Sequence, residues 1–360
     1  MVEGAQFVHI IYLHSDDYAR LTGGHVYNSR LVAALAAQGV SISDLAVPVA
    51  FPSIDAPSRA RLAAAFTELS ADAILLSDHL HIADLAPQLG SRRLRVVAIF
   101  HHSRTIEDSV SGRPADRDAE RRGFDVSDAV IVTSQATRDY IIAHYGVAPE
   151  RIIVAVPGLD PAPRSPGPAA GARSLLTLGA VIPRKRQGWL VEEVAPRLRT
   201  SGWHWRLVGD LDRDPGYVAR IRTGIAAAGL SGPIELTGGV DDATLDRLWS
   251  ETALCVAASH YEGYGMAVAE ALRRGVPVVT TQSGAVATWA GAGVSFAPAD
   301  DPSAFAKILD GLLADPSALR RLADEAWAFG STLPAWDETF AGMAGRMAAA
   351  IAGRCAVAAP

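Results

Sequence analysis

Two glutamates that frame a glycine-rich turn are the residues of this sequence best placed to do chemistry. Glu262 and Glu270 are separated by seven residues, and a Gly-Tyr-Gly turn, residues 263–265, lies between them. The run AVAEALRRG that follows, residues 267–275, has the composition of a helix. Glycines leave backbone N–H groups open, and the start of a helix points more of them outward with a partial positive charge. The segment therefore predicts a cradle for phosphate.

The two carboxylates need another role, because a phosphate site repels negative charge. Short of metal binding, the role that suits them is to accept hydrogen bonds from the hydroxyl groups of a sugar and of a ribose. A phosphate site beside a polyol site predicts a nucleotide-sugar as ligand. The structural alternative is that Glu262 is a solvated loop residue and Glu270 a surface helix residue, as in any α/β protein with a Gly turn.

Composition indicates an ordinary globular protein of two domains. The 360 residues exceed the ~250–300 at which one core usually splits, and 49% are hydrophobic and 20% charged. The sequence has no apolar run of ~18 residues and no basic start, so we expect neither a membrane span nor a secretory signal. The only two cysteines, Cys255 and Cys355, do not suggest a disulfide framework. The cytoplasm is the expected compartment.

The charge balance argues against nucleic acid and against docking on anionic lipid. Residues 1–160 carry 14 arginines, no lysine and 19 acidic residues, a net charge of −5. Residues 161–360 carry 19 basic and 20 acidic residues, a net charge of −1. Neither half has the excess of positive charge that such partners require. Against 31 arginines there are only two lysines, so Lys185 attracts notice.

Strand-like and helix-like segments alternate along both halves, which predicts parallel sheets covered on both faces. In the first half a strand over residues 7–13 leads, through a polar loop, to a helix predicted over residues 28–39. A Pro- and Gly-rich linker spans residues 159–172, and the same rhythm then restarts. We expect a first domain over residues 1–160, a second over 161–335, and a C-terminal helix over 336–360 that could cross back to the first.

The block from His260 to Val279 resembles the signature of family-4 (group 1) retaining glycosyltransferases, whose pattern is E-x7-E around a Gly-aromatic-Gly turn. The resemblance covers nearly the whole chain. It implies the GT-B fold, α/β with two Rossmann-like domains facing each other across a cleft, with ligand at the carboxyl ends of the strands. The first domain would bind the acceptor and the second the nucleotide-sugar.

The loop after the first strand of the second domain resembles the family's G-R-L-x-P-x-K-G segment, whose cations hold the donor diphosphate. Lys185 falls on the family lysine. Ala180 stands where the family often has arginine, and Arg186 where it usually has glycine. Arg184 is the candidate to replace the missing cation. A departing diphosphate needs such fixed charges because negative charge develops on its oxygens.

The resemblance also implies roles on the first domain. Gly23 and Gly24 lie in the loop before the first helix, where the family uses a Gly-Gly that approaches donor phosphate and acceptor. This is not G-x-G-x-x-G, so a nicotinamide cofactor is disfavoured. His101 and His102 follow an apolar strand, and we favour His101 for a hydrogen bond to the sugar or the incoming hydroxyl.

The remaining donor contacts follow from the same resemblance. Val240 would offer its backbone to the nucleotide base, Glu270 would hold the ribose, and Glu262 would hold sugar hydroxyls. The diphosphate would meet the amides of a four-residue stretch, Gly263, Tyr264, Gly265 and Met266. The acidic run over residues 210–214 is expected to cap a helix and not to bind a metal. Neither a metal nor any other cofactor is expected.

No carboxylate is placed as a convincing nucleophile, so we expect front-face displacement, in which the leaving phosphate takes the acceptor proton. The donor would be a UDP- or GDP-sugar. The acceptor is expected to be small, polar and neutral or cationic, with contacts from the loop of residues 14–24, including Asp16 and Asp17, and from His25. The alternatives are a non-catalytic nucleotide-sugar sensor, and an epimerase or a phosphorylase of the same fold, the last needing a pyridoxal lysine for which Lys307 is a poor candidate.

Overall fold

The computed structural model describes residues 9–15, 22–47, 54–70, 72–90, 94–167, 173–200 and 202–357. The chain divides into two compact units, one of Met1–Gly158 with Trp336–Pro360 and one of Leu159–Ala335. Each unit holds one parallel sheet of six strands within the described residues. The prediction of two Rossmann-like α/β domains is confirmed.

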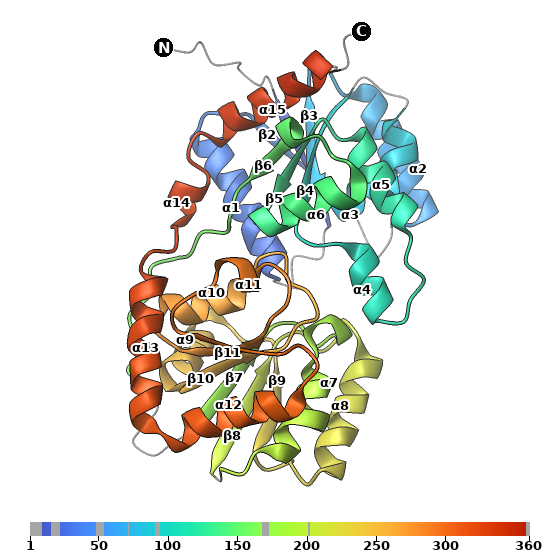
Figure 1. Cartoon of the computed structure of the whole chain (residues 1–360). Coiled ribbons are helices and arrows are strands. Elements are labelled where there is room, and N and C mark those ends of the chain that lie inside the picture. The colour runs from blue at the N-terminus through green and yellow to red at the C-terminus, as the bar shows by residue number, and fades with distance from the viewer. Residues whose placement is uncertain are drawn as a thin grey trace. The chain divides into compact units, whose positions relative to one another are not determined.

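Unit 1 is a sheet in the strand order β2-β1-β3-β4-β5-β6 with helices on both faces (Figure 1). Its inner strands are apolar and buried, as parallel strands covered on both faces must be. The strand order reverses between β1 and β3, and ligands of such sheets bind at the carboxyl ends of strands near this reversal. The strands are β1 Ile10–Ser15, β2 Ile42–Val47, β3 Ile74–Asp78, β4 Arg95–Phe100, β5 Ala129–Val132 and β6 Ile152–Val154.

The helices of unit 1 alternate with these strands. Serine, threonine or aspartate side chains cap most of their first turns, and Ser134 accepts from the amide of Thr137 at 3.0 Å. The helices are α1 Gly23–Ala37, α2 Ala56–Glu68, α3 His79–Leu89, α4 Arg104–Val110, α5 Arg117–Val126, α6 Gln135–Tyr145, α14 Trp336–Thr339 and α15 Met343–Val357, with a 3-10 turn over Pro149–Arg151.

The first helix begins five residues earlier than predicted. The sequence favoured a start at Asn28, but α1 starts at Gly23 and is capped by Thr22, whose hydroxyl accepts from the amide of His25 at 3.3 Å. Gly23 and Gly24 are therefore the first two helical residues, not loop residues. The sequence favours this start because asparagine is common at helix caps, whereas in the structure Asn28 is buried inside the helix.

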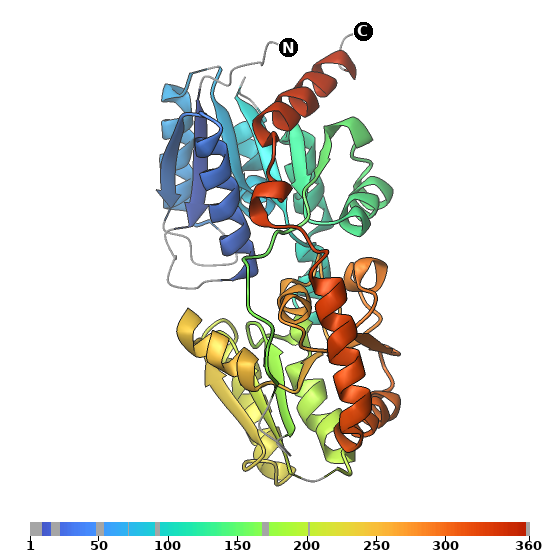
Figure 2. The same ribbon diagram turned by 90° about the vertical axis from the view of Figure 1, so that its left-hand side faces the viewer.

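The C-terminal segment belongs to unit 1. Trp336 and Phe340 stack on each other and meet the ring of Tyr27 on α1 edge to face, at 6.1 and 5.2 Å. Gln38 donates to the carbonyl of Phe340 at 2.8 Å, and Figure 2 shows α14 and α15 in red against the elements of this unit. The aromatic cluster and α15 thus help to close the core of unit 1.

Unit 2 is a sheet in the order β12-β11-β10-β7-β8-β9, so its strand order reverses between β7 and β10. The register is parallel throughout, for example Cys255 on β10 with Leu176 on β7. The carboxyl ends of β7 and β10 are therefore where this unit is expected to bind a ligand. The strands are β7 Arg173–Leu178, β8 Trp203–Val208, β9 Ile234–Gly238, β10 Leu254–Ala257, β11 Val278–Thr281 and β12 Val294–Ala297.

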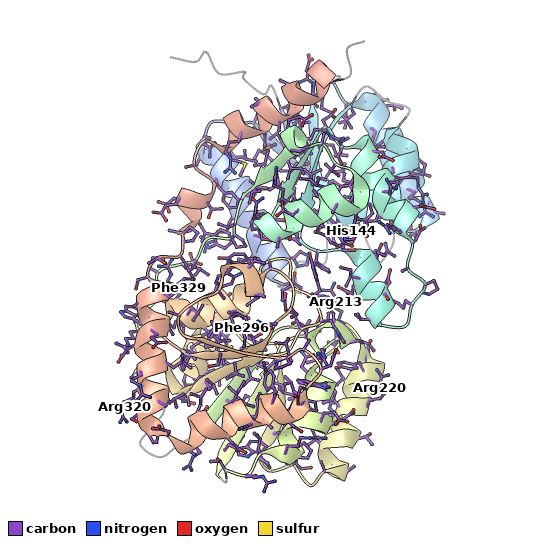
Figure 3. All side chains as sticks on the ribbon, in the orientation of Figure 1. His144, Arg213, Arg220, Phe296, Arg320 and Phe329 are labelled. Atoms are coloured by element: carbon purple, nitrogen blue, oxygen red, sulfur yellow. The ribbon has the colours of Figure 1, made fainter. Side chains whose placement is uncertain are left out.

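The helices of unit 2 pack on both faces of its sheet. The helical stretch that begins at Gln187 changes from α to π and then to 3-10 geometry. The ring of Phe329 (Figure 3) stacks on Trp289 at 6.4 Å. The helices are α7 Gln187–Trp189, a π segment Leu190–Val194, a 3-10 turn Ala195–Arg197, α8 Pro215–Ala227, α9 Asp242–Glu251, α10 Met266–Arg273, α11 Val286–Trp289, α12 Pro302–Ala314 and α13 Pro316–Gly330, with a 3-10 turn over Pro183–Lys185.

Within the described residues, none of the helices combines the length and the apolar character that spanning a bilayer requires.

Candidate active site

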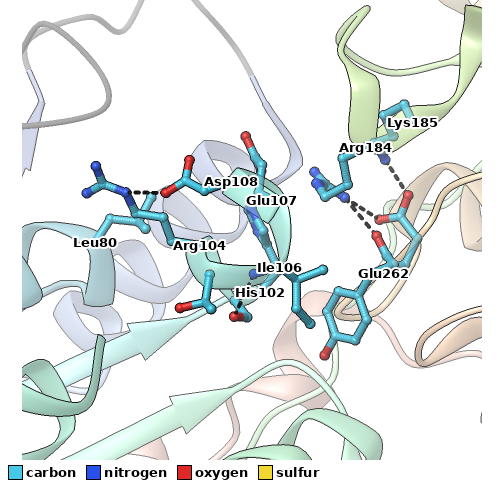
Figure 4. A network of polar contacts seen from close by, with 12 residues as sticks. Leu80, His102, Arg104, Ile106, Glu107, Asp108, Arg184, Lys185 and Glu262 are labelled. Atoms are coloured by element: carbon cyan, nitrogen blue, oxygen red, sulfur yellow. Dashed lines mark hydrogen bonds and ion pairs between the residues drawn. The ribbon is translucent and has the colours of Figure 1, made fainter. Parts of the chain in front are cut away.

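The Glu262 carboxylate is the centre of a dense polar cluster in unit 2. Lys185 Nζ donates to Oε1 of Glu262 at 2.6 Å, and Ser259 Oγ donates to the same oxygen at 2.6 Å. Arg184 Nη1 donates to the carbonyl of Tyr261 at 3.0 Å and lies 3.5 Å from Oε2 of Glu262 (Figure 4). The two cations come from the loop after β7 and the carboxylate from the loop after β10, so the reversal of strand order brings them together.

This cluster keeps Glu262 ionised. Burial alone would raise the pKa of its carboxyl, but the positive charges of Lys185 and then Arg184, with the hydrogen bonds from Lys185 and Ser259, lower the pKa to about 2. Ser259 was missed by the sequence reasoning, and its position three residues before Glu262 is the only signal that could have suggested it. The structure thus brings together three of the predicted residues: Arg184, Lys185 and Glu262.

The first turn of α10 lies beside this cluster and has no side-chain cap. Gly265 at the cap position has a φ of 96°, and a Cβ there would come within 2.4 Å of Val286 Cγ2, so only glycine fits. The uncapped amides that follow, from Met266 onward, are a ready site for an anion. A pocket joins these parts, and it is lined by Thr177, Leu178, Lys185, Gln187, Ala257, Ala258, Ser259, Glu262, Gly265, Ala267, Val268, Thr280, Ser283 and Val286.

The turn before α10 is held in place from the neighbouring loop. Tyr264 is buried with its ring stacked on Trp289 at 4.8 Å, and Trp289 Nε1 donates to the Tyr264 carbonyl at 2.7 Å. The amide of Ala285 donates to the carbonyl of Glu262 at 2.8 Å. A Cβ on Gly284 would lie 2.4 Å from the Glu262 amide nitrogen, so this glycine allows the close approach. Gly284 is a second residue that the sequence reasoning missed.

Glu270 lies apart from that pocket, on the face of α10 toward α9. Burial raises the pKa of its carboxyl to about 7, and Asp160, Asp242 and Asp246 add to the rise while Arg274 opposes it. Asp242 follows the loop that carries Val240, after β9, so the two predicted nucleoside contacts lie on neighbouring segments. Neither Glu270 nor Val240 lines the pocket beside Glu262.

Arg186 occupies a backbone position that suits glycine. Its φ is 58°, the one left-handed value among the described residues other than glycine, which explains why the family usually has glycine there. The buried guanidinium packs over the ring of Trp189 at 4.3 Å and donates to Asp300 at 2.9 Å. Ala180, in place of the family arginine, offers its carbonyl to Gln187 Nε2 at 2.9 Å.

The acidic run after β8 caps helix α8, as predicted. Asp214 Oδ1 accepts from the amide of Tyr217 at 2.8 Å, and Asp210 Oδ1 accepts from the amide of Asp212 at 2.8 Å. Among the described residues no group of three or more His, Cys, Asp or Glu side chains is arranged to hold a metal ion. Lys307, which the sequence made a poor candidate for a pyridoxal lysine, is exposed on α12.

In unit 1 the predicted residues Gly24 and His101 meet. A Cβ on Gly24 would lie 3.3 Å from Cδ2 of the His101 ring, so the helix start packs closely on the imidazole. His101 Nε2 lies 2.9 Å from Asn28 Oδ1. Burial lowers the pKa of His101 to about 4, with Asp78 opposing the shift and His102 and His25 adding to it. His101 is therefore neutral at physiological pH.

His102 faces a different partner. Its Nε2 lies 2.7 Å from Glu107 Oε2. Asp108 on helix α4 pairs with Arg104 at 3.4 Å (Figure 4) and with Arg113 at 2.7 Å. These contacts fasten α4 to the end of β4. Of the two neighbouring histidines, His102 thus contacts α4 and His101 contacts the start of α1. The predicted acceptor residues Asp16 and Asp17 lie outside the described residues.

Two family models match the chain. The model described as Glycosyltransferase Family 4 matches residues 21–163, and the one described as Glycosyl transferases group 1 matches residues 172–315. The chain belongs to the family-4, group 1 glycosyltransferases. The resemblance drawn from the E-x7-E block is confirmed.

Curated relatives of this glycosyltransferase-family chain are moderately similar. It is 27% identical over 259 residues to a D-inositol 3-phosphate glycosyltransferase of Catenulispora acidiphila, a match over 64% of this chain and 61% of that protein. It is 28% identical over 201 residues to an MMP alpha-(1->4)-mannosyltransferase of Mycolicibacterium hassiacum, over 54% of this chain and 47% of that protein. The matches span about half the length of these relatives.

Solved structures with the same fold are more distant in sequence. HepE of Anabaena, solved in complex with UDP and glucose, gives a TM-score of 0.74 at 17% identity over 95% of this chain and 99% of that one. Sucrose-phosphate synthase of Thermosynechococcus elongatus gives 0.78 at 19% identity over 93% and 97%. At this identity the likeness establishes the fold, which is that of the GT-B glycosyltransferases.

Proposed function

We propose that this chain is a retaining glycosyltransferase that moves a sugar from a nucleoside-diphosphate sugar to a hydroxyl acceptor. The observation that carries the proposal is the Lys185–Glu262–Arg184 cluster beside the uncapped start of α10. Two cations and a helix start suit a diphosphate, and an ionised carboxylate suits sugar hydroxyls. Without donor, the cations and the carboxylate satisfy one another. A diphosphate would take over the cations and leave Glu262 for the sugar.

The nucleoside part of the donor is proposed to lie along α9 and α10. Val240 would offer its backbone to the base, and Glu270 would accept hydrogen bonds from the ribose hydroxyls. The acidic surroundings of Glu270 support this role, because two hydroxyl donors would stabilise an ionised carboxylate that the free protein keeps partly protonated. HepE was solved with UDP, which supports a UDP-sugar, while a GDP-sugar stays open.

The proposed chemistry is front-face displacement. In the described part of the chain no carboxylate other than Glu262 lines the pocket, and Glu262 is engaged by two cations, so it is poorly suited to attack a sugar. The leaving phosphate would take the acceptor proton, and Lys185 and Arg184 would stabilise the charge on the departing diphosphate. His101, being neutral, would contribute a hydrogen bond. No metal takes part in this proposal.

The acceptor is proposed to be a small polar molecule bound by unit 1, in the cytoplasm. Relatives named for D-inositol 3-phosphate support a small polyol. We expect a neutral or cationic acceptor, whereas the acceptor in the names of these relatives is phosphorylated. The KM values for myo-inositol and for D-inositol 3-phosphate distinguish these two kinds of acceptor. Changing Asp16 and Asp17 to Asn is expected to raise the acceptor KM with donor affinity intact.

A thermal-shift panel of UDP, GDP and ADP and their sugars tests the proposal. Selective binding of one nucleotide stabilises the folded state, by ~2.7 kcal/mol at a ligand concentration 100 times Kd. Hydrolysis of the stabilising sugar nucleotide without acceptor then separates an enzyme from a nucleotide-sugar sensor. If no nucleotide or sugar nucleotide in the panel raises the melting temperature, the donor assignment is wrong.

A further inference from the structure

The chain contains a single asparagine, Asn28, and it lies where its chemistry must matter. It sits within α1, where asparagine is a weak helix former, and only 4% of its surface is exposed. A buried amide costs free energy unless its polar atoms find partners. The partner of Asn28 Oδ1 is the imidazole of His101, 2.9 Å away at Nε2.

A second oxygen faces the same ring nitrogen. Asp78, at the end of β3, caps α3 by accepting from the amide of Leu80 at 2.9 Å with its Oδ1. Its other oxygen, Oδ2, lies 3.7 Å from His101 Nε2. The cap bond orients the carboxylate, and Tyr27 packs edge to face against the His101 ring with the two centroids 5.2 Å apart. Nε2 is therefore held between an amide oxygen and a carboxylate oxygen.

These neighbours determine which ring nitrogen carries the proton. A neutral imidazole has one N–H donor and one lone pair, and an ionised carboxylate can only accept. A lone pair on Nε2 would point at two oxygen atoms, whereas an N–H there can donate to Asn28 and lie in the field of Asp78. The hydrogen belongs on Nε2, and the lone pair is then on Nδ1, which has no hydrogen-bond partner among the described residues.

We infer that Asn28 and Asp78 are positioning residues that hold His101 as its Nε2–H tautomer, so that Nδ1 accepts a hydrogen bond from a substrate hydroxyl. This inference rests on the proposed function for the identity of the hydroxyl, but the tautomer itself does not. The low pKa of His101 agrees with it, because a charged ring would have no lone pair to offer.

The tautomer can be measured directly. In protein with 15N-labelled histidine, two-bond 1H–15N correlation distinguishes the Nε2–H from the Nδ1–H form, and His101→Gln assigns the signals. We expect the Nε2–H pattern in the wild type and a mixed pattern in Asn28→Leu. Asn28→Asp, in which an acceptor remains, should keep the Nε2–H pattern and also serves if the leucine variant does not fold. An Nδ1–H pattern in the wild type, or an unchanged pattern in Asn28→Leu, would overturn the inference.

Kinetics connect the tautomer to the hydroxyl. With UDP-glucose or GDP-mannose, whichever the nucleotide panel selects, Asn28→Leu should lower the rate of donor hydrolysis about tenfold, the effect of one hydrogen bond. If the hydroxyl belongs to the donor sugar, affinity falls for the sugar nucleotide but not for the bare nucleotide. If the hydroxyl belongs to the incoming acceptor, kcat falls while the affinities for the sugar nucleotide and for the bare nucleotide are unchanged. Ser29→Ala, an exposed change on the same helix, is the matched control.

These readouts separate two kinds of failure. A wild type that neither binds nor hydrolyses any sugar nucleotide refutes the proposed function and leaves the measured tautomer to decide the positioning claim. A wild type that is active and loses nothing in Asn28→Leu, while Asn28→Asp is equally active, refutes the link between this tautomer and the hydroxyl.

Discussion

At the scale of single residues, the two glutamates of the signature block have opposite electrostatic surroundings. Glu262 meets two cations and a hydroxyl, whereas Glu270 meets a group of aspartates and one arginine. The same residue type in one motif is therefore ionised in one position and close to half protonated at neutral pH in the other. This difference suits different roles, one at the reacting sugar and one at the ribose.

Glu270→Ala is expected to weaken donor binding about 10- to 100-fold, because it removes an acceptor for the ribose hydroxyls. Glu262→Ala is expected mainly to lower kcat, about 100-fold, because the sugar changes charge and shape at the transition state while the ribose does not. Calorimetry with the donor and steady-state kinetics measure both effects. Glu325→Ala, an exposed helix change, is the control. Wild-type donor affinity in Glu270→Ala would show that the carboxylates are wrongly assigned.

Glu270 also predicts a pH dependence. Its pKa rises from 4.5 to about 7 on folding, so between these values the folded chain holds a proton that the unfolded chain releases. This contribution to stability is complete below pH 4.5 and is lost as the pH rises through 7. Glu270→Gln should therefore be the more stable protein above pH 7, by at most ~3 kcal/mol, and the advantage should vanish near pH 4.5.

Thermal melts of wild type and Glu270→Gln from pH 4.5 to 8.5 measure this difference. In the wild type, donor affinity should rise as the pH passes 7, while the stability falls, because the ribose contact needs the ionised carboxylate. Parallel pH profiles for the two proteins would show that Glu270 does not titrate in this range.

At the scale of elements, the site depends on how closely two loops approach. The loop after β11 reaches the Glu262 backbone only because Gly284 has no side chain and a φ of 57°. The start of α10 depends likewise on Gly265. Loop geometry, and not the polar side chains alone, thus determines the shape of this turn.

Gly284→Ala is expected to weaken nucleotide binding at least tenfold and to lower stability by roughly 1–3 kcal/mol, because the new Cβ collides with backbone atoms of Glu262. Gly311→Ala is the matched control: this glycine is in the exposed face of α12, and a Cβ there meets nothing within 4 Å. That change should stabilise the protein by up to ~1 kcal/mol through helix propensity. Urea unfolding and nucleotide titration give both quantities. Equal behaviour of the two variants would show that the close approach is unimportant.

At the scale of the whole molecule, each unit contributes a different kind of chemistry. Unit 2 offers cations, an uncapped helix start and two carboxylates, which together suit a nucleotide-sugar. Unit 1 offers a neutral histidine held by Asn28 and Asp78. Its two stretches, residues 1–158 and 336–360, carry 16 arginines and 20 acidic residues, a net charge of −4. This charge favours neutral or cationic polar ligands, although such fields are screened over ~8 Å at physiological salt.

Activity should be independent of divalent metals, because Lys185, Arg184 and the start of α10 provide the positive charge that a metal would otherwise supply. Turnover of the selected sugar nucleotide in 1–10 mM EDTA, on the order of what chelates trace metal, is expected to equal that of untreated enzyme. Activity that vanishes in EDTA and returns with magnesium or manganese would contradict this, and would make Asp210 and Asp212 the first ligand candidates.

The sequence alone was sufficient for the family, the two α/β units and the grouping of Lys185 with the glycine turn that follows Glu262. These depend on local patterns: apolar strands alternate with capped helices, and a glycine turn can be recognised from its neighbours. The difference between the predicted and the observed start of α1 also has a local cause. The start of α1 was placed at Asn28, because a helix cap and a buried helical amide look alike until a partner is known.

Only the tertiary structure decided which groups meet across the sheets. Ser259 donates a hydrogen bond to the Glu262 carboxylate, and Gly284 lets a neighbouring loop approach the Glu262 backbone. Neither residue type is distinctive in the sequence. Asn28 reaches His101 across 73 residues of sequence, and the environment of Glu270 comes from another helix. Burial and the field of nonlocal charges set a pKa or a tautomer, and these depend on the packing of segments that are distant in the chain.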